Sequence, residues 1–156
     1  MCIRDSLISY LNAFYGTYNI QLFGPSSWLR FTAIDLEYLH NLEYTYFTPF
    51  YMDYGNIRTK QFLMDFRQQY GFEPDHSSIH GFNFALLGYD VMYQFVRAYA
   101  KYGQNFGCCM ESIPDKGLIC DYNFMRPSII DGFQNESGAI IKYTREFDVK
   151  KVMDIK

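Results

Sequence analysis

The stretch FALLGYDVMYQFVRAYAKYG, from Phe84 to Gly103, decides the fold. Polar residues recur in and beside it at spacings of seven, four, three and four, namely Asn83, Asp90, Gln94, Arg97 and Lys101. Nearly all other positions are apolar, so we expect one long helix with a narrow solvated stripe and burial over most of its circumference. Gly88 in its middle costs about 1 kcal/mol relative to alanine, which predicts a close helix or strand approach at that position.

A second amphipathic helix precedes this stretch. Asn56 has the side chain of an N-cap, and Gly71 ends the helix. The apolar stripe between them consists of Phe62, Leu63, Phe66 and Tyr70. A turn at Pro74 then leads to Ser77 or Ser78, either of which can cap the long helix.

The remaining segments alternate between helical and strand patterns. Before the two helices we expect a helix over 7–15 closed by a left-handed Gly16, strands over 19–23 and 44–48, and short helices over 28–31 and 35–41. Pro49 stops the second strand because proline cannot donate to a ladder. After the long helix we expect strands over 118–124, 139–144 and 147–153. This order predicts an α/β architecture.

Composition and missing motifs exclude several classes of function. The chain has 156 residues, 49% of them hydrophobic, which fits one globular domain. Its net charge is -3 and its cationic residues are scattered, so we expect no nucleic-acid partner. No apolar run reaches the roughly 18 residues that cross a bilayer, so we expect no transmembrane segment. Nucleophile-elbow, Cys-x-x-Cys and phosphate-loop motifs are missing, so we expect neither an enzyme nor a cofactor.

Ser26, Ser27 and Trp28 are the first candidate site. They follow the carboxyl end of a predicted strand, which is where open α/β sheets bind ligands, and hydroxyls at a helix N-terminus suit a polar or anionic group. The alternative interpretation is a helix cap beside a core tryptophan.

The cysteines and histidines suggest two further sites. Cys108 and Cys109 flank a turn-rich segment with Cys120, so one of the vicinal pair can form a disulfide with Cys120; the alternative is buried free thiols. His76 and His80 have a spacing that can share a metal on a helix face, but no second ligand pair has matching spacing. We therefore predict no metal site.

A family resemblance follows from the order of these motifs. The pattern consists of Phe62-x-x-x-Phe66-x-x-x-Tyr70-Gly71-x-x-Pro74, then Ala85-Leu-Leu-Gly88-Tyr89-Asp90 opening a long helix, then Gly132-Phe133 with closing strands. It resembles the C-terminal half of type I periplasmic binding proteins, in the branched-chain amino-acid receptor group. The sequence is also similar to an envelope version of Bacteroidetes type, in which the domain follows peptidoglycan-binding LysM modules.

The resemblance implies a fold and a domain organisation. It implies part of a two-lobed, three-layer α/β fold with parallel sheets, in which Thr48, Pro49 and Phe50 form a crossover that serves as hinge. We expect residues 7–48 to end the second lobe, 49–110 to supply the returning helices of the first lobe, and 111–156 to form a final crossover with closing strands. Residues 1–6, MCIRDS, match the translation of a common sequencing adapter, and we expect them to be an artefact.

The resemblance also implies a function. Such domains bind a small polar ligand between two lobes in the periplasm or cell envelope, for ABC transport or sensing, and Phe82 would then form a wall of the ligand pocket. Amino-acid receptors of this group bind the ammonium group of the ligand with an acidic residue. The corresponding segment here, Gly24-Pro25-Ser26-Ser27-Trp28, contains no acidic residue. The alternative is a peptidoglycan-associated envelope module that keeps the fold without amino-acid binding.

Overall fold

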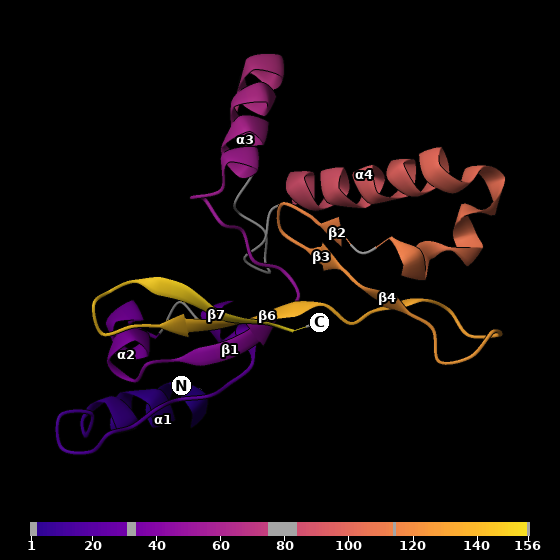
Figure 1. Cartoon of the computed structure of the whole chain (residues 1–156). Coiled ribbons are helices and arrows are strands. Elements are labelled where there is room, and N and C mark those ends of the chain that lie inside the picture. The colour runs from indigo at the N-terminus through magenta and orange to yellow at the C-terminus, as the bar shows by residue number, and fades with distance from the viewer. Residues whose placement is uncertain (1–2, 31–33, 75–83, 114, 156) are drawn as a thin grey trace. The chain divides into compact units, whose positions relative to one another are not determined.

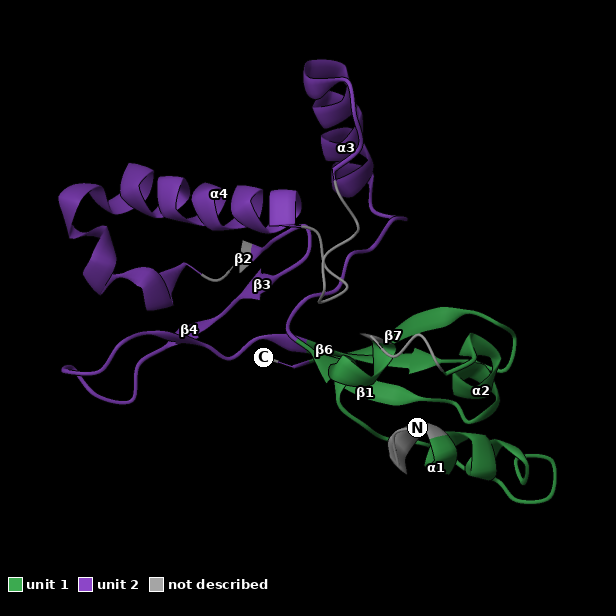
Figure 2. Ribbon diagram, turned by 180° about the vertical axis from the view of Figure 1, so that it is seen from behind, with its two compact units in different colours: residues 1–48, 139–154 green, residues 49–138, 155–156 purple. Residues whose placement is uncertain are grey.

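The computed structural model describes residues 3–30, 34–74, 84–113 and 115–155 (Figure 1). The chain divides into two compact units (Figure 2). Unit 1 contains residues 1–48 and 139–154, and unit 2 contains residues 49–138 and 155–156. Both units combine helices with short strands, as the sequence predicts.

Unit 1 is built on a three-stranded sheet. Its elements are α1 (Ile3–Asn12), the 3₁₀ helix η1 (Ser26–Arg30), α2 (Leu36–Asn41), β1 (Thr45–Thr48), β6 (Gly138–Tyr143) and β7 (Val149–Ile155). The strand order is β1-β6-β7, and β1 pairs with β6 in antiparallel register from Thr45 opposite Lys142 to Thr48 opposite Ala139. Segments almost a hundred residues apart in the sequence therefore complete one sheet.

Local sequence explains the elements of unit 1. The Asp35 carboxylate accepts a hydrogen bond from the Glu37 backbone N–H and caps α2. Along β6 the residues Ala139, Ile141 and Tyr143 are buried while their neighbours are less so, which is the alternation of a strand with one covered face. The predictions of α2, β1, β6 and β7 are thus confirmed.

Tyr44 is the centre of the unit 1 core. Its side chain is fully buried, its ring stacks on Trp28 with centroids 5.9 Å apart, and its hydroxyl donates to the Pro25 carbonyl at 2.7 Å. Further buried residues in this cluster are Ile8, Leu22, Leu39, Leu42 and Tyr143. The core is therefore hydrophobic, and the polar hydroxyl of Tyr44 within it is hydrogen-bonded.

Unit 2 contains the two long helices. Its elements are α3 (Ile57–Tyr70), α4 (Phe84–Tyr102), the 3₁₀ helices η2 (Gly103–Cys108) and η3 (Met110–Ser112), and the short strands β2 (Asp115–Lys116), β3 (Asp121–Tyr122), β4 (Phe124–Met125) and β5 (Gln134–Asn135). The pairs β2–β3 and β4–β5 are antiparallel. Asn56 caps α3 by accepting from the Arg58 N–H at 2.9 Å, and Gly71 ends it at a φ of 75°, so this predicted helix is confirmed.

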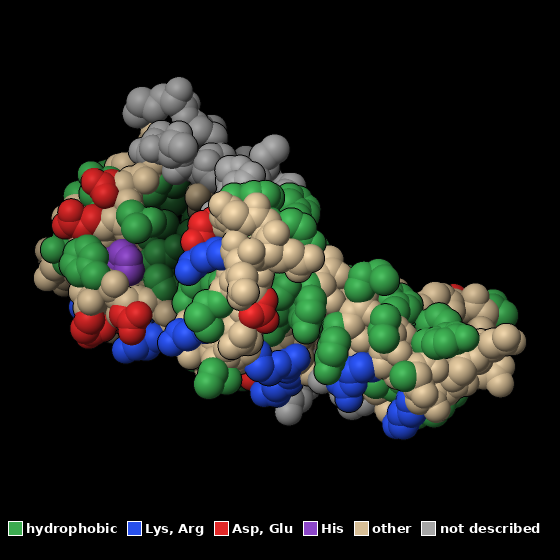
Figure 3. Space-filling model, turned by 90° about the horizontal axis from the view of Figure 1, so that it is seen from above, with side chains coloured by type: hydrophobic (Ala, Val, Ile, Leu, Met, Phe, Trp, Pro, Cys, Tyr) green, Lys and Arg blue, Asp and Glu red, His purple; other side chains and the backbone are tan. Residues whose placement is uncertain are grey.

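The orientation predicted for α4 is wrong in part. Its buried residues are Leu86, Asp90, Gln94 and Ala98, so two residues expected to be solvated lie on the packed face. Arg97 and Lys101 are exposed, as expected, and Asn83 lies outside the described residues. Met92 and Val96 are 63% and 59% exposed. On the face shown in Figure 3 hydrophobic side chains stand among polar ones. A Cβ added at Gly88 would meet no atom within 4 Å, so the predicted close approach is wrong as well.

The N-terminal segment also differs from the prediction. Helix α1 begins at Ile3, inside the six residues expected to be an artefact, and ends at Asn12 rather than near Tyr15. The chain then turns through bonds such as Thr17 N–H to the Phe14 carbonyl. The described glycines with positive φ are Gly71 and Gly103, so Gly16 does not form a left-handed cap.

The strand predictions over 19–23 and 118–124 hold only in part. The first is reduced to a parallel bridge between Phe23 and Thr45, and the second is divided into β3 and β4. The named ladders with a register are all antiparallel in the described part of the chain, which corrects the expected parallel sheet. The short turn at 144–148 joins β6 to β7, and a turn of that length brings strands back antiparallel.

Candidate functional site

Ser26, Ser27 and Trp28 lie together on η1 in unit 1. Ser26 is exposed, while Ser27 and Trp28 are half-buried. A Cβ at Gly24 would lie 2.9 Å from the Trp28 ring and 3.1 Å from the Tyr44 ring, so only glycine fits between them. Trp28 thus acts as a core residue, and the two serines keep hydroxyls near the surface. Their role as ligand-binding residues stays a prediction.

The crossover residues implied by the resemblance lie at the boundary between the two units. Thr48 is buried at the end of β1, Pro49 is exposed, and Phe50 packs against the core of unit 2. The passage from unit 1 to unit 2 falls between Thr48 and Pro49, and the return falls at 138–139, within the segment 111–156 expected to contain the final crossover and the closing strands. Phe82, His76 and His80 lie outside the described residues.

The three described cysteines are free thiols, so the predicted disulfide is not formed in the structure. Cys120 is buried in the unit 2 core, and its sulfur donates to the Asp121 carbonyl at 3.4 Å. Burial, with the nearby Asp90 charge, raises the pKa of Cys120 to about 11. The sulfurs of Cys108 and Cys109 lie 3.5 Å apart, and their hydrogen bond raises the pKa of Cys109.

Asp90 organises the middle of unit 2. Its carboxylate accepts from the backbone N–H groups of Leu118 at 2.7 and 2.8 Å, Ile119 at 2.8 Å and Cys120 at 3.3 Å. The group is 2% exposed, and these three donors replace the water that it loses. One helix side chain therefore holds the turn at 117–120.

Two further features hold the chain close to α4 near this turn. The Gln94 amide donates to the Ile113 carbonyl at 2.7 Å, one helical turn after Asp90. A Cβ at Gly117 would lie 2.2 Å from the Cys120 carbonyl oxygen and 2.5 Å from an Asp90 carboxylate oxygen. Glycine is therefore required where the chain passes α4 so closely.

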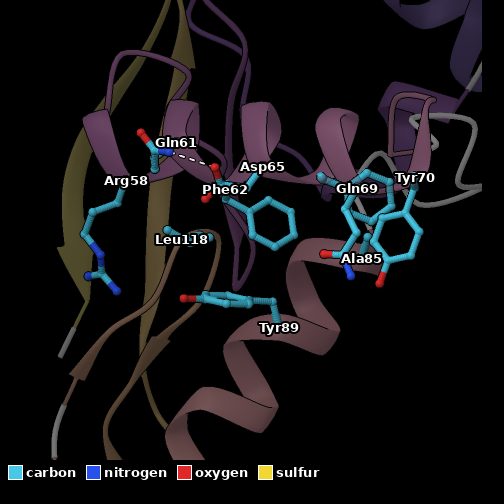
Figure 4. A pocket seen from close by; sticks show the side chains of 10 residues that line it. Arg58, Gln61, Phe62, Asp65, Gln69, Tyr70, Ala85, Tyr89 and Leu118 are labelled. Carbon is cyan, nitrogen blue, oxygen red and sulfur yellow. Dashed lines mark hydrogen bonds between the residues drawn. The ribbon is translucent and has the colours of Figure 1, made fainter.

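A groove of about 530 Å³ lies between α3 and α4 (Figure 4). One face of α3 forms most of its wall, from Arg58 to Tyr70, while Ala85 and Tyr89 come from α4 and Leu118 from the turn that Asp90 holds. All of these residues belong to unit 2. Because Leu118 is fixed by Asp90, the buried polar contact also shapes the groove.

The floor of the groove is aromatic. The rings of Phe62 and Tyr89 meet across it with centroids 4.9 Å apart, and Phe62 and Phe66 lie 6.0 Å apart along α3. Tyr70 continues the row 4.6 Å from Phe66. Such rings offer a large contact area for a flat apolar group.

Charged groups stand at separate positions along this floor. The Arg58 guanidinium donates to the Lys116 carbonyl at 3.0 Å and lies 6.0 Å from the centroid of the Tyr93 ring. The Asp65 carboxylate accepts from the Gln61 amide at 2.8 Å, as the dashed line in Figure 4 shows. Among the described residues neither Arg58 nor Asp65 forms an ion pair.

Sequence reasoning missed this groove and the Asp90 contacts. The apolar stripe of Phe62, Phe66 and Tyr70 predicts an amphipathic helix, yet polar residues alternate with it at positions 58, 61, 65 and 69. For Asp90, the available signal is an acid and an amide four residues apart in an otherwise apolar helix, which fits a buried polar row as well as a solvated one.

Comparison with known proteins gives no family for the chain, since no protein-family model and no curated protein matches it. None of the helices in the described ranges is long and apolar enough to cross a membrane. The same ranges contain no group of three or more His, Cys, Asp or Glu residues placed to hold a metal ion. Any assignment of function must therefore start from the motifs and the geometry above.

Proposed function

We propose that the chain is part of an extracytoplasmic solute-binding domain of the type I periplasmic-binding-protein kind, which binds a small polar ligand for ABC transport or for sensing. The path of the chain supports this proposal, because it leaves unit 1 at Thr48, passes through unit 2 and returns at Ala139. Short connections between compact units are compatible with hinge closure on a ligand. The motif order from Phe62 to Phe133 supports it independently.

The ligand chemistry in this proposal follows from η1. Ser26 and Ser27 supply hydroxyls that both donate and accept hydrogen bonds, and the segment from Gly24 to Trp28 has no carboxylate. A neutral or anionic polar solute therefore suits this segment better than a free amino acid, whose ammonium calls for an acid. The partners in this role are the solute itself and a permease of the envelope.

One observation favours a second candidate, a peptidoglycan-associated envelope module that does not bind a solute. Trp28, which would border a ligand, is instead stacked on Tyr44 with ring planes 10° apart. A tryptophan that completes a core is not available to cover a ligand. The fold would then be retained for its shape and its attachment to other envelope components.

Thermal-shift measurement on the full chain separates the two candidates. A panel of small neutral and anionic metabolites should contain at least one that raises the melting temperature with concentration, because ligand binding to the native state stabilises it. The double variant Ser26→Ala/Ser27→Ala should lose this shift, while Ser128→Ala, at another exposed serine, should keep it. A panel without any shift, together with retention of the chain on peptidoglycan, would reject solute binding in favour of the envelope module.

A further inference from the structure

We propose that the groove between α3 and α4 is a second binding site, which takes a small aromatic carboxylate with a hydrogen-bonding substituent opposite its acid group. The site goes beyond solute binding by hinge closure, because unit 2 alone forms it. Its volume of about 530 Å³ lies within the roughly 300–1,000 Å³ of small-molecule sites.

The aromatic part of the ligand is assigned from the floor. Phe62 is half-buried and Tyr89 is 41% exposed, so both rings present a face or an edge to the groove (Figure 4). Aromatic rings prefer offset or edge-to-face partners at centroid distances of about 4.5–7 Å. A planar ring of the ligand can extend the row that Phe62, Tyr89 and Phe66 already form.

The carboxylate is assigned from Arg58. Its hydrogen bond to the Lys116 carbonyl uses one of five guanidinium N–H donors and fixes the position of the group. The planar guanidinium matches a carboxylate in two parallel hydrogen bonds. Because Arg58 has no acidic partner among the described residues, its charge remains available to a ligand.

The orientation of the ligand follows from Asp65. It lies seven residues after Arg58 on the same face of α3, which corresponds to about 10 Å along the helix axis. Its negative charge disfavours a second acid at that end and favours a hydroxyl or amine donor. The two charges therefore give the groove a direction: the acid of the ligand at Arg58, and a donor toward Asp65.

Binding to the full chain should be measured with three probes by isothermal titration calorimetry and by ligand-observed NMR. The first is 4-hydroxybenzoate, which has the acid, the ring and the donor. The second is 4-hydroxybenzyl alcohol, which lacks the acid, and the third is trans-4-hydroxycyclohexanecarboxylate, which keeps the acid and the hydroxyl but lacks the aromatic ring. We expect saturable binding of the first probe and at least about tenfold weaker binding of each of the others, since a charged hydrogen bond or a stacked ring contributes about one factor of ten.

Matched variants locate the site. Arg58→Gln should weaken 4-hydroxybenzoate binding by about tenfold or more, and Arg58→Lys by less, because lysine keeps the charge without the paired donors. Arg67→Gln is the control on the same helix, since Arg67 pairs with Glu73 and does not line the groove, and it should leave affinity unchanged. Tyr89→Leu, which keeps an apolar side chain, should also weaken binding, whereas Tyr99→Leu elsewhere on α4 should not.

Two results would overturn the proposal: no saturable binding of 4-hydroxybenzoate to a folded chain, or equal losses in Arg58→Gln and Arg67→Gln. The double variant Ser26→Ala/Ser27→Ala should bind 4-hydroxybenzoate as the parent does, because η1 belongs to unit 1. Failure of this site and failure of the solute-binding proposal are therefore separately observable.

Discussion

The two units differ in how buried polar groups contribute to their centres. In unit 1 the fully buried side chains are large and apolar or aromatic, such as Tyr44, Leu42 and Ile141, and they lie on or beside a regular sheet. In unit 2 the buried Asp90 carboxylate accepts from the backbone N–H groups of Leu118 and Ile119, and the buried Gln94 amide donates to the Ile113 carbonyl. A backbone without a ladder still needs its hydrogen bonds satisfied, so side chains take the place of a neighbouring strand.

This difference gives the units different weak points. Unit 1 should respond most strongly to lost apolar volume, because hydrophobic burial provides most of its stability. Unit 2 should lose most stability when a buried polar side chain such as Asp90 is removed, because its loss leaves buried backbone donors without an acceptor. Substitutions at Asp90, Gly117, Cys120 and Tyr44 test this contrast.

The largest effect should come from Asp90→Ala. It removes the acceptor of three buried backbone N–H groups, and each unsatisfied donor costs about 1–3 kcal/mol, so we expect a loss of at least about 3 kcal/mol. Hydrogen exchange should show loss of protection at residues 113–125 with little change in β6, because local stability can differ between regions.

Asp65→Ala is the matched control for this substitution. Asp65 is an exposed acid on α3 with one side-chain partner, and its removal should change stability by less than about 0.5 kcal/mol. If Asp90→Ala and Asp65→Ala cost the same, or if protection in β6 falls as much as at 113–125, the contrast between the units is wrong.

A pair of glycine substitutions should give effects of opposite sign. Gly117→Ala places a methyl against the Cys120 carbonyl and the Asp90 carboxylate, and we expect a loss of about 1–3 kcal/mol from the forced shift. Gly88→Ala meets no atom within 4 Å and should gain up to about 1 kcal/mol from helix propensity. Chemical denaturation of both variants checks the prediction, and a destabilised Gly88→Ala would contradict the open surface described at that position.

The sequence predicts most elements but not the orientation of α4. Asn56, Gly71 and Pro49 act locally, so caps and strand ends can be predicted from neighbouring residues. Which face of α4 is buried depends on the turn at 117–120, about thirty residues later in the chain. Helical periodicity shows that two faces differ but not which one is covered when the polar face can bind a backbone.

The candidate sites show the same limit: contacts between distant parts of the chain cannot be predicted from local sequence. For Trp28 the sequence allows either a ligand site or a core tryptophan, and the structure places it in the core because Tyr44 lies against it. The groove is beyond sequence prediction, since it needs Arg58 and Tyr89 from two helices to face each other across a segment that no short-range pattern determines. Residues of one helix face can be identified from sequence; their partner across a groove cannot.

Alkaline pH should test the buried thiol of unit 2. The folded-state pKa of Cys120 is raised from 9.0 to about 11, so its contribution to stability is complete below pH 9 and is lost as pH rises toward 11. Thermal melts from pH 8 to 11 should show a decrease that is smaller in Cys120→Ala than in the parent. Burial also raises the pKa of Tyr44 and Tyr122, so both variant and parent should lose further stability above pH 10. Identical pH slopes in variant and parent would contradict the assignment to Cys120.

The smallest expected change in stability comes from removing the hydroxyl of a buried tyrosine. It should differ between Tyr44 in unit 1 and Tyr122 in unit 2. The Tyr44 hydroxyl donates to the Pro25 carbonyl, so Tyr44→Phe should cost about 1 kcal/mol and leave an acceptor unpaired. The Tyr122 hydroxyl is buried without a hydrogen-bond partner among the described residues, so Tyr122→Phe should be neutral or slightly stabilising. Urea denaturation of the two variants gives the comparison directly. Equal losses would contradict the unpaired state of the Tyr122 hydroxyl and mean that it has an acceptor in the folded chain.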